Sequence, residues 1–136
     1  MIVTAIDRDQ QAVDQLSDLP VERIVADLER GPWPFPDRRF HAVVCTNYLF
    51  RPRIALLAAL VSPGGAFVVE TFALGNERFG RPSNPDFLLR DGELLAVCGA
   101  AGLRVVAYEH GETSTPKPAV VQRVFAVRGS AHVALG

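Results

Sequence analysis

Short runs of apolar and β-branched residues alternate along the chain with stretches of helical periodicity, and this alternation constrains the fold most. The expected strands span residues 2–6, 21–26, 40–45, 66–71, 103–108 and 120–127. This order is typical of an α/β protein with a mostly parallel sheet crossed by helices. The connection at 109–119 is short for a parallel crossover, so we predict that the last two strands form an antiparallel hairpin.

The helix boundaries follow from capping and breaking residues. Asp9 can cap a helix after the first strand, and Pro20 stops that helix. Pro52 suits the first position of a second helix, which the turn sequence at 62–65 ends.

A third helix is expected from Asp91, the predicted cap, to Gly102, the predicted stop. The segment before it, residues 73–90, has no clear period. We expect a functional loop, a lid or a disordered excursion there.

Composition narrows the class of protein. Among 136 residues, 14 Lys and Arg stand against 15 Asp and Glu, and this balance offers no broad electrostatic surface for nucleic acid or anionic membrane. Cys45 and Cys98 lie in apolar runs without spaced metal-ligand companions, which is typical of reduced core residues. There is no apolar run of about 20 residues. We therefore expect a cytoplasmic protein with one domain over residues 1–129, a flexible tail at 130–136, and no metal, nucleic-acid or membrane partner.

Acidic residues follow the first two expected strands. A carboxylate at such a strand end can accept hydrogen bonds from both hydroxyls of a ribose, which makes Asp7 a candidate nucleotide contact. Asp7 could instead cap the next helix, a role that Asp9 can fill equally well. Asp27, after the second strand, can serve as a turn carboxylate before the loop that begins at Gly31.

Several features together resemble a known family. They are Asp7 and the pair Asp27-Leu28 after two strands, Thr46-Asn47-Tyr48 after a third, Ser62-Pro63-Gly64-Gly65 before a fourth, and the closing hairpin. The chain resembles a class I S-adenosylmethionine-dependent methyltransferase. More narrowly, it is similar to a tellurite-resistance-like bacterial subgroup through Glu70-Thr71-Phe72, Gly75-Asn76-Glu77, Phe79-Gly80-Arg81-Pro82 and the stretch 84–89.

The resemblance implies a Rossmann-like three-layer sandwich that binds S-adenosylmethionine. By resemblance, Asp7 would hold the ribose, and Asp27 and Leu28 would contact the adenine. The full set of implied cofactor-binding residues is Asp7, Arg8, Asp27, Leu28, Thr46 and Asn47.

The resemblance also implies that a small-molecule methyl acceptor is contacted by Tyr48, Glu70, Thr71, Asn76 and Arg81. Other interpretations remain open. Asn47 and Tyr48 could belong to an ordinary loop, and Arg81 could be a solvated loop charge. Methyl transfer can rest on proximity and orientation, so no catalytic residue is assigned.

The chain departs from the family in one respect, because the family's first strand and glycine-rich turn are absent. Gly64-Gly65 and Gly75 fall at the wrong place in the strand order to replace that turn. The expected N-terminal truncation would leave the strands at 2–6 and 40–45 each with an unpaired edge, and buried unpaired backbone groups cost about 1–3 kcal/mol each.

Three arrangements could satisfy these unpaired edges. The two flanking strands could pair with each other, another chain could supply a strand, or the first two strands could pair with a second copy of the chain. We expect the second or third, and hence a homodimer that can be strand-exchanged. The resulting function hypothesis is a methyltransferase acting on a small molecule. The alternative is a non-catalytic remnant that serves as an oligomerising or binding module.

Overall fold

The computed structural model describes all 136 residues, and they form two compact units. Unit 1 is Met1–Asp37 and unit 2 is Arg38–Gly136. The division falls inside the single domain expected over residues 1–129, and residues 131–136 contain no helix or strand. The expected domain and its flexible tail stay predictions.

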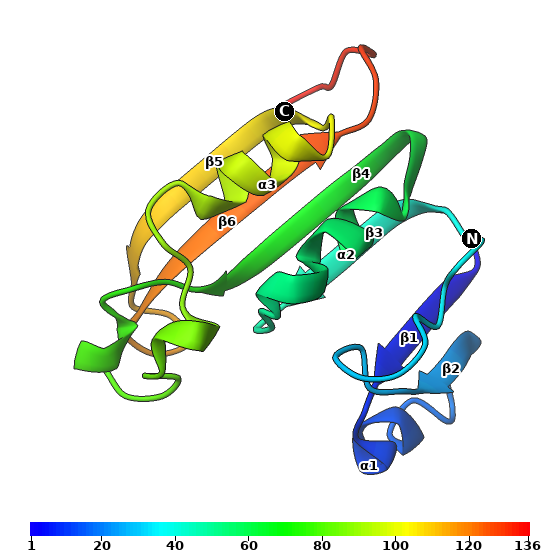
Figure 1. Cartoon of the computed structure of the whole chain (residues 1–136), viewed down its shortest axis with the longest axis horizontal. Helices are drawn as coiled ribbons and strands as arrows, with labels where there is room; N and C mark the ends of the chain where they lie inside the picture. Colours follow the sequence, from blue (N-terminus) through cyan, green and yellow to red (C-terminus); the bar gives the residue numbers. More distant parts are fainter. The chain divides into compact units, whose positions relative to one another are not determined.

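Unit 1 is a two-stranded parallel sheet with one short helix, drawn in blue in Figure 1. Strand β1 (Val3–Asp7) pairs with β2 (Val21–Val25), and helix α1 (Gln10–Asp14) lies between them in the chain. Asp9 caps α1, because its carboxylate accepts a hydrogen bond from the amide of Gln11 at 2.9 Å. This confirms the predicted cap.

Unit 2 is built on a four-stranded sheet in the order β3-β4-β6-β5. Its strands are β3 (Phe40–Thr46), β4 (Val61–Phe72), β5 (Arg104–Thr113) and β6 (Ala119–Val127). β3 and β4 are parallel, whereas β6 is antiparallel to both β4 and β5, which confirms the predicted hairpin. With β1 and β2, two strand pairings are parallel and two antiparallel, so the expected mostly parallel sheet is not confirmed.

Two helices cover one face of the sheet of unit 2 (Figure 1). They are α2 (Ile54–Ala59), preceded by the 3-10 turn η1 (Arg51–Arg53), and α3 (Glu93–Ala100). Under them lies a closed apolar core that includes Phe67, Leu94 and Ala126, all fully buried. None of the helices has the length and apolarity needed to span a membrane.

The opposite face of this sheet carries apolar side chains that are at least partly exposed. Val44, Val68 and Phe125 are register partners on β3, β4 and β6, so they lie side by side on one face. Val44 is 67% exposed and Val68 is 36% exposed. Within unit 2 the helices therefore cover a single face, and the expected three-layer sandwich stays a prediction.

The turn predicted at residues 62–65 lies inside β4 instead of preceding it. Phe40 is opposite Val61, but Ala42 is opposite Ala66, so residues 62–65 form a bulge on β4. The bulge is held to the end of β6, because Gly64 donates to the Arg128 carbonyl and Arg128 donates to the Gly65 carbonyl.

The start of α3 also differs from its prediction. Its N-cap is Gly92, with φ of 68°, and not Asp91. The missing side-chain cap is supplied from β6 by Gln122, whose Oε1 accepts from the Leu94 amide at 3.4 Å and whose Nε2 donates to the Arg90 carbonyl at 2.6 Å. The predicted stop, Gly102, follows α3 with φ of 72°.

The segment at 73–90 is folded. It contains two short 3-10 turns, η2 (Asn76–Arg78) and η3 (Pro85–Phe87), and its ends are joined by a bridge between Ala73 and Leu89.

Candidate functional site

The carboxyl ends of β1 and β2 bring together the two acidic residues singled out in unit 1. Asp7 lies opposite Val25, its carbonyl accepts a hydrogen bond from Ala26 at 3.1 Å, and Asp27 follows directly. Ligands of open parallel sheets bind at this edge. Unit 1 thus brings both carboxylates to the edge at which a nucleotide is expected.

The hydrogen bonds of these carboxylates separate the roles that the sequence left open. Asp9 fills the capping role, while Asp7 is exposed and its Oδ1 accepts from the Asp9 amide at 2.9 Å. Asp27 Oδ1 accepts from the amide of Glu29 at 2.8 Å, which is the turn interaction considered for it. Next to them, Arg8 is exposed and Leu28 is half-buried.

In unit 2, the residues after β3 occupy the carboxyl edge of the parallel pair β3 and β4. Asn47 has φ of 54°, a left-handed conformation that Asn tolerates better than most residues, and its amide donates to the Glu70 carbonyl at 2.9 Å. Thr46 and Asn47 are exposed and Tyr48 is half-buried. This left-handed dihedral is the one expected of Asn in an ordinary loop.

Glu70 and Thr71 are neighbours in β4 and therefore point to opposite faces of the sheet. Thr71 is 2% exposed on the helix-covered face, whereas Glu70 lies on the open face. The structure does not bring these two predicted substrate contacts together.

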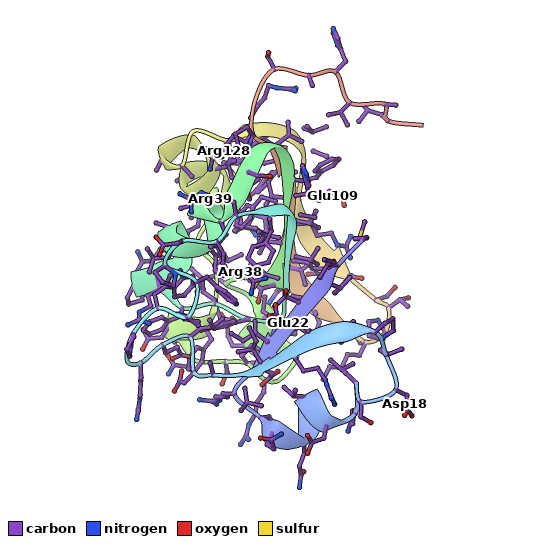
Figure 2. All side chains as sticks on the ribbon, turned by 90° about the vertical axis from the view of Figure 1, so that its right-hand side faces the viewer. Asp18, Glu22, Arg38, Arg39, Glu109 and Arg128 are labelled. Atoms are coloured by element: carbon purple, nitrogen blue, oxygen red, sulfur yellow. The ribbon has the colours of Figure 1, made fainter.

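Glu70 belongs to a row of charged side chains across the open face. Arg123 on β6 forms ion pairs with a glutamate on each neighbouring strand. Its Nε lies 2.9 Å from Oε2 of Glu70 on β4, and its Nη1 lies 3.4 Å from Oε1 of Glu109 on β5. The hydrogen bond from Arg123 to Glu70 raises the pKa of the guanidinium. Figure 2 shows Glu109 on β5, on the other side of the sheet from Arg39 and Arg128. A ligand that approaches Glu70 meets a carboxylate already paired.

The two predicted substrate residues of the folded segment differ in exposure. Asn76 is 2% exposed, and its side chain donates to the Pro82 carbonyl at 2.9 Å and accepts from the Val120 amide at 3.1 Å. The amide oxygen thus ties the segment to β6, while the amide nitrogen holds two parts of the segment together. Arg81 is exposed.

The residue that anchors this segment is Arg51, which sequence reasoning missed. All five of its N–H donors are used: two bind the carboxylate of Glu93, and three bind backbone carbonyls of residues 85, 86 and 88. The partners lie more than 30 residues away, so no local pattern indicates them. Burial would raise the pKa of Glu93, but hydrogen bonds from Arg51 and from the Arg90 amide outweigh it and lower that pKa.

A groove of about 770 Å³ lies between α2 and α3, and Glu93 is part of its lining. Its walls are mostly small and apolar, with Arg39 and Arg128 toward the amino-terminal end of β4. Arg128 donates to the carbonyls of Val61, Ala58 and Ala101, so its guanidinium caps the ends of both helices. None of the residues predicted for cofactor or substrate lines this groove.

Comparison of the sequence with protein-family models and with curated proteins gives no match. Solved structures are similar to it at low identity. An S-adenosylmethionine-dependent methyltransferase from Methanosarcina mazei aligns with 93% of this chain and 82% of its own, at 14% identity and a TM-score of 0.67.

Two further structures extend the likeness. Magnesium protoporphyrin IX methyltransferase from Synechocystis, with SAH bound, aligns with 94% of this chain and 64% of its own, at 17% identity and a TM-score of 0.64. A cyclase aligns with 96% of this chain and 67% of its own, at 15% identity and a TM-score of 0.67. At these identities the likeness establishes a methyltransferase-like fold, and the cyclase illustrates that one fold carries different reactions.

Proposed function

We propose that this chain is an S-adenosylmethionine-dependent methyltransferase that acts on a small molecule in the cytoplasm. The observation that carries the proposal is the pair of carboxylates at the carboxyl edge of unit 1, in a chain with a methyltransferase-like fold. We further assign the chain to the tellurite-resistance-like subgroup, on the motifs from Glu70 to Leu89.

Unit 1 would hold the adenosine part of the cofactor. Asp7 suits the ribose, because an exposed carboxylate with one engaged oxygen retains acceptor capacity for two adjacent hydroxyls. Leu28 would pack on the adenine, while Asp27, with Oδ1 engaged by Glu29, has its other oxygen for the exocyclic amine. Arg8 would lie beside the ribose.

The other residues proposed for cofactor contact, and those proposed for the acceptor, belong to unit 2. Thr46 and Asn47 are exposed polar groups at a strand edge, which fits contact with a polar cofactor. When bound, the cofactor supplies an electrophilic methyl group on a sulfonium. The contribution of the protein is then to align the acceptor with that methyl group, which needs no fixed acid or base.

The residues proposed for the acceptor divide into two groups. Tyr48 and Arg81 are at least partly accessible, so they suit direct contact, and Arg81 favours an anionic acceptor. Glu70, Thr71 and Asn76 are paired or buried. They would position the elements around the acceptor and would not contact it directly.

Calorimetric titration of the full chain with S-adenosylmethionine tests this function. We expect saturable binding with competition by SAH. Folded protein that gives no heat and retains no labelled cofactor in equilibrium dialysis would contradict the proposal and favour the non-catalytic binding module.

A further inference from the structure

The two outer strands of the sheet of unit 2 differ in the protection of their edges. β5 carries Arg104, Glu109 and Glu112 and has an irregular register at Val105, features that discourage pairing with another strand. Figure 2 shows Glu109 on this edge. The other outer strand, β3, contains no Asp, Glu, Lys or Arg, and His41 stands at its second position.

The same contrast exists in unit 1. β2, the charged strand, contains Glu22 and Arg23, whereas β1 is uncharged up to its last residue, Asp7. β1 has only five residues, so β3, with seven, offers the longer uncharged edge.

The backbone N–H and C=O groups of every second residue of β3 point away from β4. The Asn47 amide donates to the Glu70 carbonyl of β4, and amide directions alternate along a strand. The N–H and C=O groups of Val44 and Thr46 therefore face the outer edge. They form a template for a further strand.

One side chain of this outer strand is also suited to contact. Val44 is 67% exposed in the middle of β3, and its register partner Val68 is 36% exposed. A valine this exposed within a strand gains from burial when another strand lies alongside.

We propose that β3 is a dimerisation edge, where it pairs in an antiparallel arrangement with β3 of a second copy of this chain. A two-fold interface brings the same surface against itself, which the uncharged edge of β3 permits without like-charge contacts. The edge of β5 is less suited, because its charged side chains and its irregular register discourage pairing with a further strand. The interface joins two four-stranded sheets into one and buries Val44 of both copies.

Sedimentation velocity of the full chain over a range of micromolar concentrations tests this interface. We expect a species of twice the mass of one chain. Val44→Pro removes an N–H that faces the outer edge and leaves the hydrogen bonds to β4 in place, so it should yield a folded monomer. A wild-type chain that stays monomeric throughout, or a Val44→Pro chain that stays dimeric, would overturn the proposal.

Two lysine variants cover the case in which Val44→Pro fails to fold. Val44→Lys places like charges across the proposed junction and should shift the chain to monomer. Val68→Lys adds the same charge to the same face one strand further in, and it should remain dimeric. Equal effects of the two variants would overturn the assignment of the edge, and circular dichroism confirms that each is folded.

Discussion

Arg51 and Glu93 form a bidentate ion pair, with Nε 2.8 Å from Oε2 and Nη2 2.9 Å from Oε1, that joins the start of η1 to the start of α3. The same guanidinium holds three carbonyls of residues 85–88. A single side chain therefore organises the segment between β4 and α3.

Arg51→Ala should lower the free energy of unfolding by roughly 2 to 4 kcal/mol, because it leaves a carboxylate and several carbonyls without their donor. Urea denaturation measures the change. Arg81→Ala removes an exposed arginine of the same segment and should stay within about 0.5 kcal/mol of wild type. Similar losses in both variants would contradict the anchoring role.

The lowered pKa of Glu93 predicts a dependence of stability on pH. A carboxyl group whose pKa is depressed on folding stabilises the protein above its ordinary value of 4.5, and this contribution is lost as the pH falls through the folded-state pKa. Glu93→Gln should therefore be less stable than wild type at neutral pH, and the difference should shrink below pH 4.5. Parallel acid-unfolding curves would show that Glu93 contributes nothing of this kind.

Gln122 is fully buried and satisfies the backbone at the start of α3. Gln122→Leu should lower the free energy of unfolding by about 1 to 3 kcal/mol, because the Arg90 carbonyl and the Leu94 amide lose their partner. Thermal unfolding followed by circular dichroism checks this. A more stable variant would mean that apolar packing outweighs the cap.

Gly65 has no room for a side chain, since a Cβ there would lie 2.8 Å from the His41 carbonyl oxygen and 2.9 Å from that of Ser62. Gly65→Ala should destabilise the protein by roughly 1 to 3 kcal/mol, because backbone atoms must shift. Gly99→Ala is the matched control: it lies in α3 with open space around it and should stabilise by up to about 1 kcal/mol. Denaturation midpoints of the two variants should therefore move in opposite directions.

Local signals in the sequence predicted much of the fold. The strands that begin at Val21 and Phe40 start where they were predicted to start, and the Asp9 cap and the closing hairpin follow from short-range rules. The start of α3 could not be predicted in this way, because its cap comes from Gln122, 28 positions away. The position of residues 62–65 inside β4 could not be predicted either, because it depends on their hydrogen bonds with Arg128 at the end of β6.

The candidate site, too, could be predicted only where it depends on local signals. Parallel pairing of β1 and β2 places Asp7 and Asp27 at one edge once both strands are recognised. The burial of Asn76, the pairing of Glu70 with Arg123, and the hydrogen bonds of Arg51 all depend on contacts between distant segments, which no motif encodes.

The central claim, cofactor binding through Asp7, is tested most directly by calorimetric titration of S-adenosylmethionine into the full chain and two variants. Asp7→Asn should weaken binding about 10- to 100-fold, because charge-assisted hydrogen bonds to the ribose are lost. Asp18→Asn changes an exposed carboxylate in the turn before β2 (Figure 2) and should bind as wild type does. Equal affinity of wild type and Asp7→Asn, or no binding by the folded wild-type chain, would contradict the claim.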